Sequence, residues 1–168
     1  ALNTINSGFQ VAFMAPTEIL ARQHFNFAKK IFPKKFNIQL ISGKSNLKDK
    51  KVIVNNLNQH KIDIIFGTHA IFQKKISFRK LGLIIIDEQH KFGVNQRKKL
   101  SDKGGDNCDV LLMTATPIPR TLTMTVFGDM DLSIIREKPK NRKPIKTYSK
   151  LDNKIDDVIK FIKKEINL

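Results

Sequence analysis

Two adjacent carboxylates, Asp87 and Glu88, directly follow a run of apolar residues that ends at Ile86. A carboxylate at the end of a buried strand can hold Mg²⁺, which prefers oxygen ligands and keeps several waters. In phosphoryl transfer such an aspartate coordinates the metal on the β- and γ-phosphates, and a neighbouring glutamate can polarise the attacking water. Two solvated acids that open a loop would give the same dipeptide, so the pair alone leaves both interpretations open.

Small and polar residues follow three other apolar runs, namely Pro16-Thr17, Gly67-Thr68-His69 and Thr114-Ala115-Thr116. Thr17 and Thr116 have the residue type and setting of helix N-caps. A helix N-terminus with exposed N–H groups is also an anion site, so Thr17 and Thr68 are candidates for holding backbone phosphates of a nucleic acid. Capping is the simpler interpretation of each threonine alone. Their joint occurrence on one edge of a parallel sheet would favour the phosphate interpretation.

The histidines and the single cysteine, Cys108, show no spacing typical of a transition-metal site. Taken alone, His90 is more simply a hydrogen-bonded structural residue. One cysteine excludes an internal disulfide and fits a reducing compartment, and we expect no disulfide-linked partner. The sequence has no signal-peptide pattern, and its apolar runs are too short to span a bilayer. We therefore expect a cytoplasmic chain that has no membrane partner.

Apolar runs alternate with amphipathic segments, which predicts an α/β fold with a mostly parallel sheet covered by helices on both faces. The predicted strands are 10–15, 37–41, 62–66, 83–86 and 110–113. The predicted helices are 17–32, 47–58, 96–103 and a segment that ends at 127. In helix 17–32 we expect Ile19, Leu20, Phe27, Ile31 and neighbouring phenylalanines to be buried. Because ligands bind beyond the carboxyl ends of parallel strands, the candidate residues should share one edge of the sheet.

The character of the sequence changes beyond Gly128. Residues 129–137 are compatible with a further strand, and the two prolines and the polar residues of 138–144 indicate a linker. A short strand over 145–149 and a helix over 152–166 follow, which is too little for a domain. We therefore expect a first domain over 1–137, a linker over 138–144 and the start of a second domain over 145–168.

The net charge of +16 invites a nucleic-acid interpretation, since basic surfaces bind phosphate backbones by releasing counterions. Lysine, isoleucine and asparagine dominate the composition, and each third of the chain is basic, with no block of five like charges. A DNA-binding face and a merely lysine-rich solvated surface therefore both remain open.

Five segments occur in an order that resembles the RecG-type ATP-dependent DNA helicases of bacteria, which are superfamily 2 motors that remodel stalled replication forks and branched DNA. The segments are MAPTEILARQH (14–24), FGTHAIF (66–72), LGLIIIDEQHKFGVNQR (81–97), LLMTATPIPRTL (111–122) and GDMDLSIIREKPKNRKPIKT (128–147). The transcription-repair coupling translocases share ATPIPRTL, but their acidic motif usually reads Asp-Glu-Glu-Gln. Here the motif is Asp87-Glu88-Gln89-His90.

The resemblance implies roles for the candidate residues. Asp87 would hold Mg²⁺ and Glu88 would activate water, while Gln89 and His90 would relay the nucleotide state. Thr114 and Thr116 would couple ATP hydrolysis to movement of two RecA-like motor lobes. The turns Pro16-Thr17 and Gly67-Thr68-His69 would grip the DNA backbone, and such contacts position the strand without reading sequence. The cofactors implied are ATP and Mg²⁺, and the partner is branched or forked DNA, bound by a monomer.

The family's phosphate loop, Gly-x-x-x-x-Gly-Lys-Thr, does not occur in these 168 residues. By the family pattern it would lie upstream of Ala1, and residues 1–7 resemble the tail of the helix that follows it. Most of the second lobe and the fork-splitting wedge domain are also missing. We therefore expect residues 1–137 to be an incomplete first motor lobe, and the isolated chain to be inactive.

Three alternatives remain open. In the first, the chain is part of a transcription-repair coupling translocase. In the second, it is a degenerate motor lobe that binds DNA without catalysis. In the third, it is an unrelated doubly wound domain that uses Asp87 at a small-molecule site. The second alternative predicts salt-sensitive DNA affinity without nucleotide dependence. The third predicts no DNA affinity at modest salt.

Overall fold

The computed structural model describes residues 1–43, 46–73, 75–88, 108–115, 131–137, 145 and 147–166. The chain divides into two compact units, Ala1–Pro119 and Arg120–Leu168. The first unit carries the sheet and all the candidate site residues that the structure describes.

Five parallel strands form one sheet in the first unit. Their order across the sheet is β2-β3-β1-β4-β5, and each neighbouring pair is parallel. The strands are β1 (Gln10–Met14), β2 (Ile38–Ile41), β3 (Ile64–Gly67), β4 (Leu81–Ile86) and β5 (Asp109–Leu112). The five predicted strands and their parallel arrangement are thus confirmed, with ends that shift by one or two residues.

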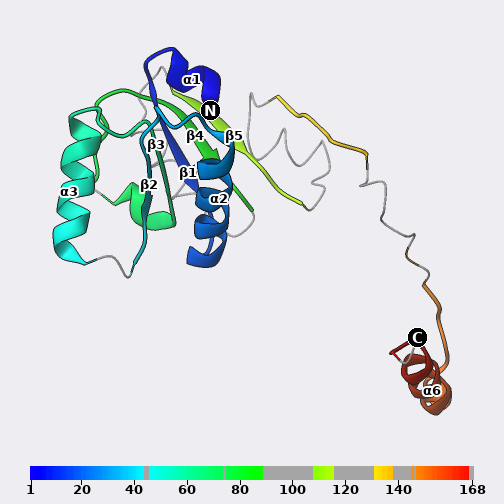
Figure 1. Ribbon diagram of the computed structural model, residues 1–168. Helices are drawn as coiled ribbons and strands as arrows, with labels where there is room; N and C mark the ends of the chain where they lie inside the picture. The colour runs from blue at the N-terminus through cyan, green and yellow to red at the C-terminus, as the bar shows by residue number, and fades with distance from the viewer. Residues whose placement is uncertain are drawn as a thin grey trace. The chain divides into compact units, whose positions relative to one another are not determined.

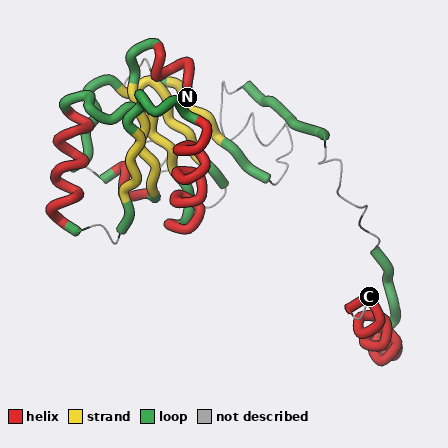
Figure 2. Tube along the Cα trace, viewed as in Figure 1, coloured by secondary structure: helices red, strands yellow, loops and turns green. Residues whose placement is uncertain are grey.

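Helices cover both faces of this sheet, as Figure 1 shows for the first unit and Figure 2 shows by element type. Short α1 (Leu2–Asn6) and α2 (Glu18–Ile31) lie on one face, and α3 (Leu47–Asn58) lies on the other. A 3₁₀ helix, η1 (His69–Phe72), follows β3 directly and was not expected from the sequence. This three-layer arrangement is the predicted α/β fold.

Each face of the sheet has its own apolar cluster. Leu57 of α3 packs with strand residues such as Met14 and Ile86, which are all at most 1% exposed. On the opposite face Ala28 of α2 packs with residues such as Phe66. Strands that are buried on both faces are nearly all apolar, which explains the runs in the sequence.

The predicted buried face of α2 is only partly right. Ile19, Phe27 and Ile31 are 80%, 61% and 58% exposed, whereas Ala21 and Ala28 are buried. Leu20 is half-buried as expected, and the neighbouring Phe25 and Phe32 pack against the core. Small alanines let the helix backbone approach the sheet closely. Because alanine is less hydrophobic than isoleucine or phenylalanine, the sequence pattern favours the three large side chains as the buried ones. The prediction therefore failed for Ile19, Phe27 and Ile31, which lie on the exposed part of α2.

The second unit contains η4 (Asp152–Lys154) and α6 (Ile155–Ile166), which together match the predicted helix over 152–166. The described residues of 129–137 and 145–149 form no strand, so both strand predictions are wrong there. The predicted helices over 96–103 and up to 127 lie outside the described residues. In the part of the chain that the structure describes, no helix has the length and apolar character needed to cross a membrane.

Candidate functional site

The carboxyl ends of the strands are level with one another. Met14 of β1 pairs with Gly67 of β3 on one side and with Ile86 of β4 on the other. Ile41 pairs with Gly67, and Ile86 pairs with Leu112. The turns that follow these strands therefore leave the sheet at one edge, as predicted.

Backbone hydrogen bonds continue one residue beyond the strands and fix the start of each turn. The amide of Ala15 donates to Gly67 O at 2.9 Å, and the amide of Asp87 donates to Met14 O at 2.9 Å. The amide of Met113 donates to Ile86 O at 2.8 Å. The position of Asp87 is thus set by the sheet itself and not by a free loop.

The Asp87 carboxylate is half-buried and held through both oxygens. Its Oδ1 accepts from the amide of Glu88 at 3.0 Å, and its Oδ2 lies 2.9 Å from Nε2 of His24. The side chain is 19% exposed. A carboxylate has about four lone-pair sites, so two donors leave acceptor capacity for a cation or for water.

Glu88 has a left-handed backbone, with φ of 52°. Residues other than glycine adopt this region rarely, and the conformation costs on the order of 1–3 kcal/mol. The residue is half-buried. Strain of this kind is frequent at functional sites, where the surrounding structure holds a side chain in a required direction.

In the turn after β1, Pro16 is half-buried and Thr17 is exposed. Thr17 is the N-cap of α2, and its hydroxyl accepts from the amide of Leu20 at 3.3 Å. The capping interpretation of Thr17 is therefore confirmed. The exposed N-terminus of a helix at the sheet edge remains compatible with a phosphate contact.

At the end of β3, Gly67 and the following Thr68 are buried and His69 is exposed. Thr68 is 9% exposed and precedes η1, where its side chain makes no capping hydrogen bond. His69 is thus the accessible side chain of this turn. Gly67 is required by packing, because a Cβ at this position would lie 2.5 Å from Ile41 O.

The remaining candidates are placed only in part. Thr114 lies two residues beyond β5 and is half-buried. Gln89, His90 and Thr116 lie outside the described residues. The structure thus brings Pro16-Thr17, Gly67-Thr68-His69, Asp87-Glu88 and Thr114 to one edge of the sheet.

Sequence reasoning missed His24, which reaches Asp87 from α2. His24 lies in the same helical stripe as Ala21, Phe25 and Ala28, at the spacing i, i+3, i+4 and i+7. The true buried stripe would have placed His24 toward the sheet. The error in the buried face of α2 therefore also concealed this residue.

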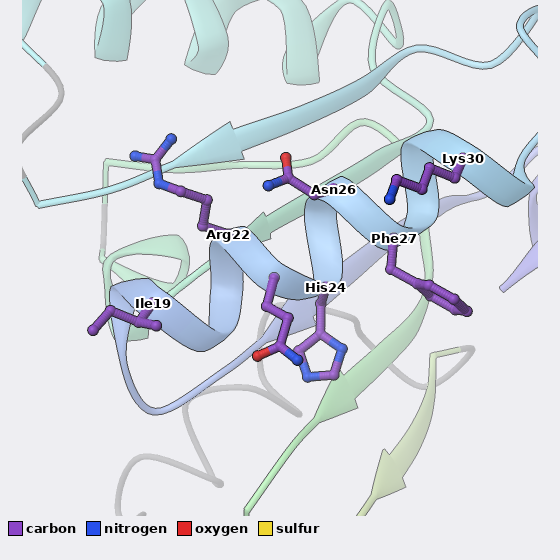
Figure 3. A pocket seen from close by; sticks show the side chains of 7 residues that line it. Ile19, Arg22, His24, Asn26, Phe27 and Lys30 are labelled. Atoms are coloured by element: carbon purple, nitrogen blue, oxygen red, sulfur yellow. The ribbon is translucent and has the colours of Figure 1, made fainter.

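A hollow of about 690 Å³ runs along α2 and is lined by residues of that helix alone. Figure 3 shows the His24 ring on the side of the helix away from Arg22 and Asn26. Neither Asp87 nor Glu88 lines this hollow. The hollow is thus a feature of one helix surface and is separate from the sheet edge that carries the acidic pair.

The donor set at Asp87 fits Mg²⁺. This ion is commonly bound through one or two carboxylates, with substrate phosphates and waters as its other ligands. No group of three or more His, Cys, Asp or Glu side chains suited to a metal occurs among the described residues. A single carboxylate with unused lone pairs does not need such a group to take part in a Mg²⁺–phosphate site.

Cys108 has a raised pKa. Burial against the core is the main cause, because it disfavours the thiolate, and the neighbouring Asp109 carboxylate adds to the effect. The thiol therefore stays protonated near neutral pH and is a poor nucleophile. Nothing in this environment assigns Cys108 to the chemistry at the sheet edge.

A family model described as DEAD/DEAH box helicase matches residues 1–125. Among curated relatives, the ATP-dependent DNA helicase RecG of Streptococcus pneumoniae is 47% identical over 96% of this chain. The RecG proteins of Bacillus subtilis and Borreliella burgdorferi are 48% and 45% identical over 96% and 98% of it. The chain spans about a quarter of the length of these relatives, 24% in each case.

Solved structures agree with this assignment. The structure of RecG bound to a three-way DNA junction matches 95% of this chain and 21% of that chain, with a TM-score of 0.75 and 36% identity. Mss116p bound to single-stranded RNA and AMP-PNP covers 74% of this chain and 29% of that chain, with a TM-score of 0.57, but its 20% identity shows a shared fold alone. The chain therefore belongs to the DEAD/DEAH box helicase family and is of the RecG type over nearly its whole length.

Proposed function

We propose that this chain is part of an ATP-dependent DNA helicase that acts on branched DNA. The observation that carries the proposal is the common register of Met14, Gly67 and Ile86, which puts the acidic pair and both threonine turns at one sheet edge. The solved relative with 36% identity is bound to a three-way DNA junction, and this supports branched DNA as the substrate.

The nucleotide side of the site is proposed to centre on Asp87 and Glu88. Mg²⁺, when bound with ATP, would neutralise charge on the β- and γ-phosphates. Asp87 offers the carboxylate oxygens that such an ion prefers, and Glu88 is the adjacent group able to accept a proton from water. Gln89, His90, Thr114 and Thr116 are proposed to link the nucleotide state to motion between two motor lobes.

The DNA side is proposed to use the turns after β1 and β3. Thr17 and His69 are exposed and able to contact a phosphate, whereas Pro16, Gly67 and Thr68 shape the turns that present them. Contacts of this kind bind any sequence, because they touch the phosphate and not the base. This matches a motor that must move along DNA of all sequences.

The finer biology is proposed from the same basis. The whole protein would remodel stalled forks in recombination and repair, and would act as a monomer. Residues 1–137 would belong to its first motor lobe, 138–144 to the interlobe linker and 145–168 to the second lobe. Folded strand and helix content supports the first of these assignments most directly.

The test is Glu88→Gln in the RecG-length protein that carries this chain. The amide keeps the shape of the side chain but cannot take a proton, so we expect DNA-stimulated ATP turnover to fall by about 100-fold or more. Binding to a three-way junction, measured by fluorescence anisotropy, should change by less than about two-fold, because the DNA-facing turns are intact. Glu165→Gln, in α6, is the matched control and should leave turnover unchanged.

Two results would contradict the proposal. Undiminished turnover in Glu88→Gln would remove Glu88 from its role. Junction binding that is salt-sensitive but indifferent to ATP and its analogues would instead favour a degenerate, non-catalytic lobe.

A further inference from the structure

The contact between His24 and Asp87 joins two elements that are far apart in the sequence. Nε2 of His24, on α2, lies 2.9 Å from Oδ2 of Asp87, 63 residues later at the end of β4. The two side chains are 32% and 19% exposed. An ionised carboxylate only accepts hydrogen bonds, so Nε2 carries the proton and donates it.

The imidazole ring is itself held in place. Its centroid lies 4.6 Å from the ring of Phe13, in β1, and Phe13 stacks on Phe66, in β3, at 5.1 Å. The same stripe of α2 contributes Ala21 and Ala28, both buried, which let the helix lie close to the sheet. The ring therefore packs against the aromatic side chains of the sheet on one side, while 32% of the side chain stays exposed.

Asp87 is consequently held by two donors that come from different directions. The amide of Glu88 binds Oδ1, and the His24 ring binds Oδ2. Each donor is anchored independently, one by the backbone after β4 and the other by the packing of α2. A carboxylate held through both oxygens keeps one orientation, so the acceptor sites that remain on it are fixed in place.

We propose that His24 is a positioning residue for Asp87, which fixes the orientation of the carboxylate toward the cation it would hold. The inference rests on the proposed function, in which Asp87 is that metal-binding group. Hydrogen bonds to a metal-binding carboxylate are typically worth 10- to 100-fold in metal affinity. His24 touches neither the cation nor the phosphates in this role.

The first experiment tests the contact without metal or nucleotide. His24→Phe, Asp87→Ala and the double variant of the 168-residue chain are unfolded in urea with EDTA present. Alanine is used at position 87 because an asparagine oxygen would still accept the hydrogen bond. We expect the effects on the unfolding equilibrium constant to be non-additive by about five-fold or more, because the two side chains share one hydrogen bond. His60→Phe, which changes a histidine just beyond the end of α3, should combine additively with Asp87→Ala.

The second experiment measures Mn²⁺ affinity of the same chain by the electron paramagnetic resonance signal of free Mn²⁺. We expect His24→Phe to weaken binding by about 10- to 100-fold. His24→Gln, whose amide nitrogen reaches about as far as Nε2, should restore affinity to within a few-fold of the original. The rescue separates a donated hydrogen bond from a general loss of packing.

The outcomes distinguish the two proposals. Additive effects of His24→Phe and Asp87→Ala on unfolding would overturn the positioning role, as would a His24→Phe variant that keeps full Mn²⁺ affinity while Asp87→Ala loses it. If Asp87→Ala leaves Mn²⁺ binding unchanged, the metal role of Asp87 fails. In that case the unfolding cycle alone decides whether His24 holds the carboxylate.

Discussion

At the scale of single residues, Gln10 makes the most concentrated set of polar contacts in the described core. It is fully buried, and its Nε2 donates to the carbonyl oxygens of Leu57 and Ile62 at 3.0 and 2.9 Å. Its Oε1 accepts from the amides of Arg79 and Lys80 at 2.9 and 3.1 Å. One side chain thus joins the end of α3, the entry to β3 and the entry to β4.

We predict that Gln10→Leu lowers the free energy of unfolding by about 3 kcal/mol or more. The apolar side chain fills a similar volume but leaves buried carbonyl groups without a donor, at a cost of about 1–3 kcal/mol each. Urea unfolding of the 168-residue chain measures the loss. Gln39→Leu is the matched control, since Gln39 is half-buried and donates to Asn37 Oδ1 at 2.9 Å, and its loss should stay below about 1 kcal/mol. Equal losses in the two variants would be inconsistent with this role of Gln10.

At the scale of secondary-structure elements, the predicted strands follow from apolar runs that are buried on both faces of the sheet. The start of β4 was predicted two residues too late because of a glycine. β4 begins at Leu81 and includes Gly82, where a Cβ would lie 2.7 Å from Cβ of Phe9. In the sequence this glycine looks like a break before residue 83, whereas in the fold it permits a close approach between packed segments.

The shared sheet edge of the candidate site could be predicted because the strands could be predicted. Because strand order and direction place the carboxyl ends at one edge, Asp87 and the turns at Thr17 and Thr68 are brought together as expected. His24 was not predictable from the chosen stripe of α2. A contact across 63 residues depends on which side of a helix faces the sheet, and Ile19, Phe27 and Ile31 indicated the wrong one.

The end of β3 gives a prediction that separates packing from DNA contact. At Gly67 a Cβ would lie 2.5 Å from Ile41 O and 3.0 Å from Cγ1 of Ile71, so Gly67→Ala should lower the free energy of unfolding by about 2–3 kcal/mol. Gly43→Ala is the matched control, because nothing lies within 4 Å of its Cβ and the change should stay within about 0.5 kcal/mol. Thermal unfolding measures both.

The expected loss of stability in Gly67→Ala affects how DNA binding by this variant is interpreted. A Gly67→Ala protein that binds DNA weakly does so through a displaced turn, and the loss does not assign Gly67 a direct contact. If Gly67→Ala is as stable as the Gly43→Ala control, the close approach of β2 and β3 at this point is not a constraint. A direct contact between Gly67 and DNA would then be the better explanation for glycine at this position.

At the scale of the whole molecule, the net charge of +16 is weaker evidence for a specific ligand site than the arrangement of residues at the sheet edge. The lysines and arginines that the structure describes are spread over both units and mostly exposed. Such a surface attracts any polyanion and is weakened by salt. The general charge therefore does not identify a DNA site, and the DNA contact proposed for the turns after β1 and β3 rests on their common position at the sheet edge.

The 168 residues contain the acidic motif but no Gly-x-x-x-x-Gly-Lys-[Ser/Thr] loop to hold the triphosphate. Groups that act on ATP together lose nearly all activity when one is removed. We therefore predict that the 168-residue chain releases phosphate from ATP no faster than the Glu88→Gln chain, with or without a three-way junction. The RecG-length protein, assayed beside it, should show turnover that the junction stimulates. The opposite result would be DNA-stimulated phosphate release by residues 1–168 that is absent in Glu88→Gln. It would mean that this lobe holds ATP without a phosphate loop and that the roles proposed for the residues at the sheet edge are wrong.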